Sequence, residues 1–400
     1  MEETPKSNVD PEHDFVERMI LEQYGERFRQ CIQCGVCTGS CPNSFFMEYP
    51  PRKFIAALRA NLLDRVIQSN TAWTCISCFS CSLRCPSGIK LTDVLIPNLR
   101  EEILLKGKAT PQEVQKALEN TSRYGNPLGE SARKRSDWTK QASVPVKILS
   151  QTPEPVEALW FVECYPSYNL RNIVTSQAFS RILNALKINF GILGHEESCA
   201  GDDVRLGGEK GLFEMLVERN NKALKKYKFD FILFTDPHAY NAFKNEYPKF
   251  GVQYKTVHYT KFLADRIDKL KSLFKKELAG TVTYHDPCYL GRRNGEYEAP
   301  RELLKAIPGL KLVEMPRTRE NALCCGGGGG GIWLDSYIGE YSKERLSEKR
   351  IKEISHVGAN ILAVACPYDM SRFEDAVKVT GYEGKIAVKD IIELIDEAMQ

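Results

Sequence analysis

The hydrophobic and polar positions along this chain follow two periods, and the change between them divides the sequence. Up to about residue 120 the apolar side chains recur at helical spacing. We therefore predict helices over 14–28, 52–69 and 91–107, the last kinked at Pro97 because proline lacks the N–H that an internal turn needs. The apolar positions of the first two helices are Phe15, Met19, Ile20 and Tyr24, then Phe54, Leu58, Leu62 and Ile67.

From about residue 157 short apolar runs of strand length alternate with longer amphipathic segments. This order is typical of α/β structure with a mainly parallel sheet. We predict strands over 158–164, 229–236, 281–288 and 359–366. The helices expected between and around them cover 176–188, 211–227, 300–307 and 337–354.

The α/β part contains one unit twice. Cys164, Cys199 and Asp236 each have a counterpart about 125 to 130 residues later, at Cys288, Cys324 and Cys366. The predicted fold class is therefore α+β and multidomain, with an all-helical N-terminal module and a C-terminal α/β module of two repeats. The expected boundaries are 1–120 for the helical module, 121–156 for a turn-rich connector, 157–278 for the first repeat and 279–400 for the second.

Composition and charge exclude several classes of protein. A chain of 400 residues with 42% hydrophobic and 27% charged residues is an ordinary globular protein of two to three domains. The net charge of +3 argues neither for nor against a nucleic-acid partner, but Lys and Arg are spread along the chain rather than clustered, which argues against one. We find no apolar run long enough for a membrane span and no export signal in the polar N-terminus, so we expect a cytoplasmic protein. Any membrane attachment would then come from another protein of the same complex.

Cysteine is the residue that carries the chemistry. Eight of the fourteen cysteines form two runs of the pattern C-x-x-C-x-x-C-x-x-x-C-P, which is the spacing of ferredoxins that hold two [4Fe–4S] clusters. The first run is Cys31, Cys34, Cys37 and Cys41, and the second is Cys75, Cys78, Cys81 and Cys85. Disulfides and zinc fit a run of four cysteines followed by proline poorly.

The fourth cysteine of each ferredoxin run usually ligates the other cluster. We therefore expect Cys85 to complete the site of the first run and Cys41 to complete the site of the second. The alternative, in which each run keeps its own four cysteines, stays open.

The segments GNPLG, HDPCYLGR and CCGGGGGG, together with the ferredoxin runs, make this chain resemble the D-type subunits of the heterodisulfide reductase family. That type fuses a helical dicluster ferredoxin module to a catalytic module with two cysteine-rich CCG repeats. The resemblance implies up to five thiolates per repeat, which can hold an unusual non-cubane [4Fe–4S] cluster.

The chain departs from the family pattern in both repeats. The first keeps Cys164 and Cys199, but Ala200, Asp236 and Ala239 stand where the family has cysteine. The second keeps four thiolates and ends in a carboxylate; its candidate ligands are Cys288, Cys324, Cys325, Cys366 and Asp369. We therefore expect one further [4Fe–4S] cluster in the second repeat and no family-type cluster in the first.

Two groups beside the second repeat's cysteines are candidate catalytic residues. Asp369 is expected to be an additional oxygen ligand or a neighbour that tunes potential and proton supply, although it could instead cap the following helix. His285, with Asp286, could shuttle a proton, and a purely structural turn is the equal alternative.

Three other features have less direct roles. Glycines 326–331 let the backbone approach a cluster and offer N–H groups to its sulfurs. Arg292 and Arg293 are expected to be a solvated pair rather than a site for an anionic substrate. His238 is expected to be structural, with a residual zinc site as the alternative.

These residues favour an electron-transfer component of a heterodisulfide-reductase-like complex, for example of a bifurcating or benzoyl-CoA-reductase type. The alternative is a catalytic component that reduces or oxidises a disulfide or trisulfide at the third cluster. A relay serving a flavin partner that oxidises glycolate, lactate or glycerol-3-phosphate is a third class. No G-x-G-x-x-G opens a helix directly after a strand, so we expect no nucleotide or flavin here. The expected partners are a flavin and iron–sulfur protein resembling the A-type subunits of heterodisulfide reductase, or a membrane quinone or haem protein.

Overall fold

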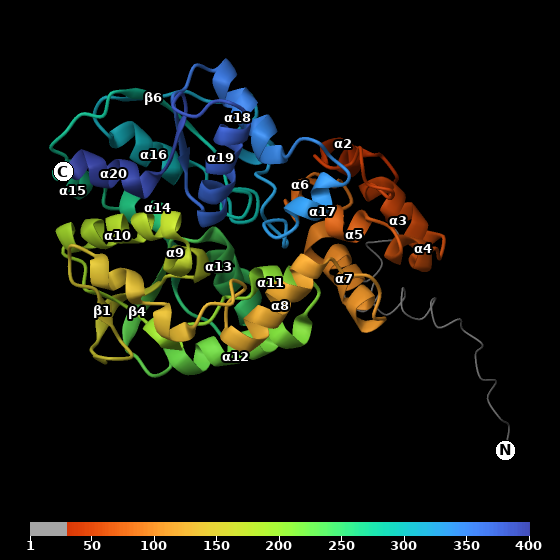
Figure 1. Cartoon of the computed structure of the whole chain (residues 1–400), viewed down its shortest axis with the longest axis horizontal. Coiled ribbons are helices and arrows are strands. Elements are labelled where there is room, and N and C mark those ends of the chain that lie inside the picture. The colour runs from red at the N-terminus through yellow and green to blue at the C-terminus, as the bar shows by residue number, and fades with distance from the viewer. Residues whose placement is uncertain (1–29) are drawn as a thin grey trace. The chain divides into compact units, whose positions relative to one another are not determined.

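A computed structural model describes residues 30–400 of the chain, so the helix predicted over 14–28 lies outside the described residues. The chain divides into two compact units, one ending at Thr110 and the other beginning at Pro111. Figure 1 shows short helices in the first unit and sheets covered by helices in the second. The predicted fold class is confirmed. Among the described residues no helix is both long and apolar enough to cross a membrane.

The first unit is built from short helices around its cysteine loops. The helix predicted over 52–69 is wrong in one respect: it is broken into two helices at Asn61, which has a left-handed φ of 56°. Pro97 lies in the first turn of its helix, directly after a single π-helical turn over Leu91–Leu95, where its missing N–H costs little. The helices are α2 Val36–Ser40, α3 Pro51–Arg59, α4 Leu63–Ile67, α5 Thr71–Thr74, α6 Ser80–Leu83 and α7 Ile96–Leu105.

The second unit contains two parallel sheets. One has the strand order β1-β3-β2-β4-β5 and the other the order β7-β6-β8-β9. The first sheet consists of β1 Lys147–Ile148, β2 Val156–Phe161, β3 Phe190–Ile192, β4 Phe229–Phe234 and β5 Thr256–His258. The second consists of β6 Gly280–Tyr284, β7 Leu310–Leu312, β8 Ile361–Val364 and β9 Ala387–Asp390.

Helices connect and cover these strands. The first group is α8 Gln112–Tyr124, α9 Cys164–Tyr168, α10 Leu170–Ala185, α11 Asp202–Leu206, α12 Lys210–Leu224, α13 Pro237–Asn241, α14 Tyr259–Ala264 and α15 Ile267–Lys271. The second group is α16 Glu298–Ala306, α17 Asp335–Gly339, α18 Leu346–His356, α19 Pro367–Val379 and α20 Ile391–Met399. The single helix predicted over 337–354 is therefore wrong, because the chain leaves the helical conformation between α17 and α18.

The two sheets share one topology, which is the structural form of the sequence repeat. In each, the first strand of the repeat lies between the second and the third, and the fourth follows the third. The first sheet gains β1 at its edge, because Lys147 and Ile148 pair with Gly191 and Ile192. Residues 121–156, which we expected to be a connector, thus contribute a strand to the sheet. All strands are parallel, so the loops that carry the repeat cysteines follow the carboxyl ends of strands, where α/β sheets bind ligands.

The two repeats pack through α10 and α20, which run beside each other in Figure 1. Arg181 of α10 forms a bidentate ion pair with Asp396 of α20, with a shortest N–O distance of 2.6 Å. The buried Tyr259 hydroxyl donates a hydrogen bond of 2.8 Å to Asp390, whose carboxylate also caps the N-terminus of α20. These contacts join α10 and Tyr259 of the first repeat to the last helix of the second.

We expect Tyr259→Phe to lower the free energy of unfolding by about 1.5–3 kcal/mol, because it removes a buried hydrogen bond to a carboxylate. Tyr227→Phe is the matched control, since Tyr227 makes a similar 2.7 Å bond to Glu196 but is only partly buried. Chemical denaturation of both variants measures the difference. Equal losses would show that the Tyr259–Asp390 contact does not hold the repeats together.

Candidate metal centres

The two ferredoxin runs fold into the same loop. In the first, Gln33 and Gly35 on either side of Cys34 have left-handed φ values of 55° and 83°. In the second, Ser77 and Phe79 flank Cys78 with φ values of 46° and 61°. Three of these four residues are not glycine, and residues other than glycine rarely adopt positive φ values. The surrounding structure therefore holds both runs in the same strained conformation at corresponding positions. A positive φ on both sides of the second cysteine of each run turns the first three thiols of that run toward a common centre.

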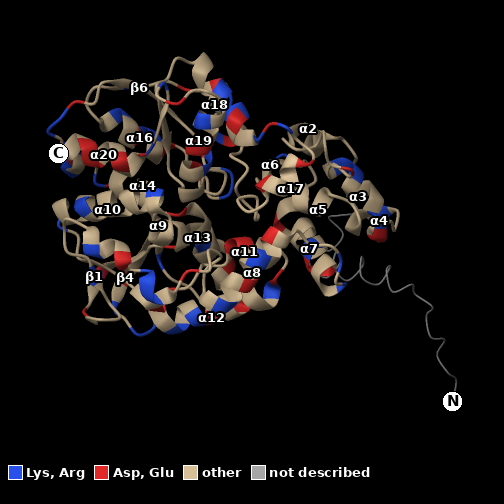
Figure 2. Ribbon diagram, viewed as in Figure 1, with Lys and Arg blue, Asp and Glu red and all other residues tan. Residues whose placement is uncertain are grey.

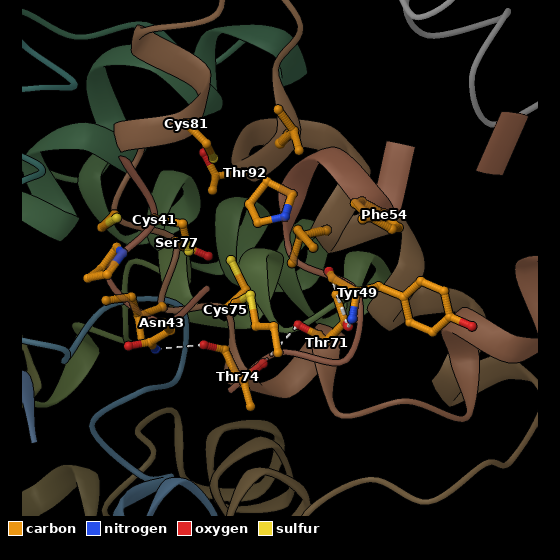
Figure 3. A pocket seen from close by; sticks show the side chains of 17 residues that line it. Cys41, Asn43, Tyr49, Phe54, Thr71, Thr74, Cys75, Ser77, Cys81 and Thr92 are labelled. Carbon is orange, nitrogen blue, oxygen red and sulfur yellow. Dashed lines mark hydrogen bonds between the residues drawn. The ribbon is translucent and has the colours of Figure 1, made fainter. Parts of the chain in front are cut away.

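Cysteines of both runs line one cavity in the first unit (Figure 3). Cys41 of the first run lies there with Cys75, Cys78 and Cys81 of the second. Burial, with the neighbouring Cys75 thiol, raises the pKa of Cys41 to about 12, and burial likewise raises the pKa of Cys81. Four thiols this close and this buried ionise only beside a cation, and the irons of a cluster supply that charge.

The remaining cysteines of the two runs form a second group. Burial raises the pKa of Cys37, and the neighbouring Cys31 and Cys85 thiols raise it further. Cys34 of the same run is exposed. The first run's second cysteine therefore faces solvent, whereas the corresponding Cys78 is buried. Cys85 therefore lies near Cys37 of the first run and Cys41 near Cys75 of the second, and the exchange of fourth cysteines stays a prediction.

Arg100 supports the loop of Cys75, one of the four cysteines that line the cavity. We did not predict this role from the sequence. Its side chain is fully buried, with its guanidinium 5.0 Å from the ring centre of Trp73. It donates hydrogen bonds to the Ala72 carbonyl at 2.9 Å and to the Cys75 carbonyl at 2.6 Å. The sequence does hold one signal for this role, because Arg100 stands among the apolar positions of the segment 91–107.

The second repeat brings Cys288, Cys324 and Cys325 together at the carboxyl edge of its sheet. The Sγ atoms of Cys288 and Cys324 are 4.0 Å apart. One ligand atom each of His285, Cys325 and Asp369 lies within 4.8 Å of the others. Cys366 begins α19 and is buried. A hydrogen bond with Cys324 and burial raise the pKa of Cys325 well above its usual value. These thiols are therefore crowded together, as those of the ferredoxin module are.

The glycine run wraps this site with backbone N–H groups. Those of Gly326 and Gly327 donate to the Sγ atoms of Cys324 and Cys325, both at 3.4 Å. A Cβ atom on Gly331 would lie 2.3 Å from the Gly326 carbonyl oxygen, so glycine is required there. The buried Arg372, whose role we did not predict, holds the loop by donating to the Cys325 carbonyl at 3.0 Å.

Asp369 faces the site rather than capping its helix. Its Oδ1 lies 3.6 Å from Nε2 of His285, and within the described residues its buried Oδ2 has no hydrogen-bond partner. Burial raises the pKa of Asp369 to about 7. Burial also lowers the pKa of His285 well below its usual value, so the imidazole is neutral. Thiols, an unpartnered carboxylate oxygen and backbone donors are the groups that an iron–sulfur cluster uses.

Other candidate residues near this site have structural partners. Asp286 forms a bidentate ion pair with Arg301 at 2.7 and 2.9 Å, which favours the structural alternative for this residue. Arg292 is buried and donates to the Ala322 carbonyl at 2.7 Å, and Arg293 pairs with Glu246 at 2.9 Å. The expectation of a solvated arginine pair is wrong for this reason.

Residues of the first repeat contact the loops of this site, which we did not predict from the sequence. Asp203 accepts hydrogen bonds from the Gly330 N–H at 3.2 Å and from the Tyr368 hydroxyl at 2.8 Å. The His238 ring stacks on Tyr289, with ring centres 3.9 Å apart, and lies 4.6 Å from Tyr368. The first repeat therefore supports the cysteine loops of the second.

The first repeat's own site has a different set of groups. Ligand atoms of Glu163, Cys164 and Cys199 lie within 4.8 Å of one another. Asp236, at the former cysteine position, accepts a 2.7 Å hydrogen bond from the His238 N–H and caps α13. Ala200 and Ala239 are buried there and offer no ligand atom.

The GNPLG segment and the residues after it hold these two cysteines. The Gly125 carbonyl, at a residue with φ of 73°, accepts the Cys199 N–H at 2.8 Å. Arg135 donates to the Sγ of Cys164 at 3.4 Å and to Glu197 at 2.7 Å. A cation thus occupies the position next to Cys164, and it comes from the part of the chain that looked like a connector.

Comparisons with known proteins agree with this architecture. Residues 30–90 match the 4Fe-4S dicluster domain family, and residues 158–244 and 282–368 match the cysteine-rich CCG domain family. The first CCG match covers most of β2 and all of β3 and β4, and the second covers most of β6 and all of β7 and β8, each with the loops that follow these strands. The chain is therefore an iron–sulfur protein with a dicluster module and two CCG domains.

Full-length relatives extend the comparison. The chain is 35% identical to the probable iron-sulfur-binding oxidoreductase FadF of Bacillus subtilis over 96% of this chain and 61% of the relative. It is 32% identical to the EtfAB:quinone oxidoreductase of Syntrophomonas wolfei, over 86% of this chain and 48% of the relative. The chain therefore spans about half to three fifths of the length of these two relatives. It is also 32% identical to the D-type heterodisulfide reductase protein of Methanosarcina mazei, over 92% of this chain and 93% of the relative. The chain belongs to this D-type heterodisulfide reductase family of iron–sulfur oxidoreductase subunits.

Proposed function

We propose that this chain is an electron-transfer protein that relays electrons between redox partners through three [4Fe–4S] clusters. Two lie in the ferredoxin module and one in the second CCG repeat. The observation that carries the proposal is the contrast between the repeats. Cys288, Cys324 and Cys325 gather with Asp369 in the second, whereas the first places Arg135 beside its two thiols.

The proposed ligand sets follow the grouping of the thiols. Cys31, Cys34, Cys37 and Cys85 hold one ferredoxin cluster. Cys75, Cys78, Cys81 and Cys41 hold the other. Cys288, Cys324, Cys325 and Cys366 hold the third, with Asp369 facing the same site. When bound, such clusters accept and donate single electrons.

The chain's own residues hold the third site in a water-poor environment. Backbone N–H groups of the glycine run donate to two of its sulfurs, and Arg372 fixes the backbone of that run. At a pH above its pKa of about 7, Asp369 adds a negative charge, which disfavours reduction of a neighbouring cluster. The replacement of cysteine by Asp369 and the missing ligands of the first repeat also argue against a pair of non-cubane clusters that cleave a heterodisulfide between them.

The relatives indicate which partners to test. One is named an EtfAB:quinone oxidoreductase and another a heterodisulfide reductase. We therefore propose an electron-transferring flavoprotein as the electron donor and a quinone-reactive or flavin-containing protein as the acceptor. Reduction or oxidation of a disulfide or trisulfide at the third site is the second candidate, and the orphaned Asp369 Oδ2 beside the buried thiols is the observation that favours it.

The iron content tests the number of clusters. Anaerobically purified protein should contain about 12 iron atoms per chain, and the double variant Cys288→Ser, Cys324→Ser about 8, because its third site loses two thiolates. Cys164→Ser, which changes a cysteine of the first repeat, is the matched control and should keep about 12. A wild-type value near eight would leave the second repeat empty.

The reduction potential of the third cluster tests the role of Asp369. Asp369→Asn should raise it by on the order of 50 mV, about tenfold in the one-electron equilibrium, because a negative charge is removed at similar shape. Asp375→Asn, in the same helix but with its side chain 54% exposed, is the control and should leave the potential unchanged. EPR-monitored redox titration gives both values. Identical curves for the two variants would mean that Asp369 has no electrostatic role in the site.

Rapid mixing distinguishes the two candidate functions. A reduced electron-transferring flavoprotein from the same organism should bleach the visible absorbance of the clusters within one encounter, and the Cys288→Ser, Cys324→Ser variant should lose the kinetic phase that belongs to the third cluster. Steady turnover of a disulfide or trisulfide by the isolated reduced chain, with no response to the flavoprotein, would instead establish sulfur-substrate catalysis.

A further inference from the structure

The first repeat retains two cysteines that the proposed clusters do not use. Cys164 follows β2 and Cys199 follows β3, so the sheet brings them to the same carboxyl edge. Their sulfurs and a carboxylate oxygen of Glu163 lie within 4.8 Å of one another. Cys164 and Cys199 are thus a close pair of thiols rather than isolated remnants of a site.

The two thiols differ in their access to solvent. Cys164 is buried, whereas Cys199 is partly exposed and lines a small cavity. Carboxyl groups outnumber cations among the residues that line the cavity, although Asp202 pairs with Arg205 at 3.2 Å. Two of these carboxyl groups belong to α11, whose acidic residues Figure 2 shows in red. The charged lining residues of the cavity are Glu163, Asp202, Asp203, Asp236 and His238. Within the described residues Oδ2 of Asp202 and Nδ1 of His238 are buried there without hydrogen-bond partners.

Arg135 distinguishes this thiol pair from a metal site. Its guanidinium donates to the Cys164 sulfur at 3.4 Å and is fixed by the buried Glu197 at 2.7 Å. Burial raises the pKa of Cys164, while the hydrogen bond from Cys199 and the charge of Arg135 oppose that rise. A fixed cation beside the sulfur stabilises a thiolate and repels a second cation such as zinc.

We propose that Cys164 and Cys199 form a reversible thiol–disulfide couple, with Cys199 as the attacking residue and small cationic disulfides as its preferred reactants. Cys199 is the attacking thiol because it lines the cavity and Cys164 does not. Its hydrogen bond with Cys164 and its burial raise the pKa of Cys199 well above the usual value, so this thiol loses its proton only as it attacks. The four carboxyl groups of the cavity attract a cationic disulfide and repel an anionic one. This couple exchanges two electrons, and it does not depend on whether the second repeat holds a cluster.

The exchange proceeds in two balanced steps. The Cys199 sulfur bonds to one sulfur of the disulfide RSSR, whose S–S bond breaks; the released sulfur takes the proton that Cys199 loses and leaves as RSH. The Cys164 sulfur then attacks the Cys199 sulfur, and the second R–S group leaves as RSH with the proton that Cys164 loses. RSSR is reduced to two thiols while the protein dithiol is oxidised to a disulfide. The two sulfurs must approach from at most 4.8 Å to about 2.05 Å, which side-chain rotation can supply.

The test uses cystamine, a cationic disulfide, on the anaerobic iron-loaded protein, followed by alkylation of free thiols and peptide mapping. We expect a Cys164–Cys199 disulfide with the iron content unchanged. Cys164→Ser should trap a stable cystamine adduct on Cys199, because the resolving thiol is missing, and Cys199→Ser should trap none. At low salt cystamine should react at least about tenfold faster than the anionic glutathione disulfide, and added salt should narrow that difference.

Three results would overturn the proposal. One is a wild-type protein whose Cys164 and Cys199 both remain alkylatable after cystamine treatment. Another is one zinc per chain in the wild type that is lost in Cys164→Ser. The third is a glutathione disulfide that reacts as fast as cystamine at low salt. The wild-type peptide map alone can contradict the proposal, even if a variant fails to fold. The iron assay on the same sample tests the proposed third cluster separately.

Discussion

Sulfur that is taken out of water must be given a positive charge or keep its proton, and this constraint shapes every functional part of the chain. In the ferredoxin module, burial raises the pKa of Cys41 to about 12, so that group of thiols is suited to iron. In the second repeat, backbone N–H groups of the glycine run reach two of the sulfurs. In the first repeat, the guanidinium of Arg135 takes the place beside Cys164. One constraint thus has three different local solutions.

The repeated α/β unit explains how the solutions differ. Both sheets have the same strand order and place their loops at the carboxyl edge, so each offers the same positions for ligands. In the first repeat those positions hold a helix cap at Asp236 and the buried Ala200 and Ala239. Its Asp203 instead fixes Gly330 and Tyr368 of the second repeat. The first repeat therefore offers fewer cysteines at these positions, and its Asp203 supports the loops that carry the cysteines of the second repeat.

Local spacing made part of this structure predictable. The cysteine runs, the strand and helix order and the repeat all follow from residues close together in sequence. The missed elements depend on contacts between distant residues. The break at Asn61 interrupts a pattern that reads as one helix, and Arg135 reaches Cys164 from a segment with the turn-rich composition of a linker. The stacking of His238 on Tyr289 joins two repeats and has no sequence signal at all.

We propose that iron is divided between the ferredoxin module and the second CCG repeat, with none in the first. Anomalous diffraction at the iron edge, from crystals of the anaerobically prepared holoprotein, locates the metal directly. We expect two cluster-sized peaks among the eight ferredoxin cysteines, each bounded by cysteines of both runs, and a third beside Cys288, Cys324 and Cys325. An iron peak at Cys164 and Cys199, or an empty second repeat, would contradict it.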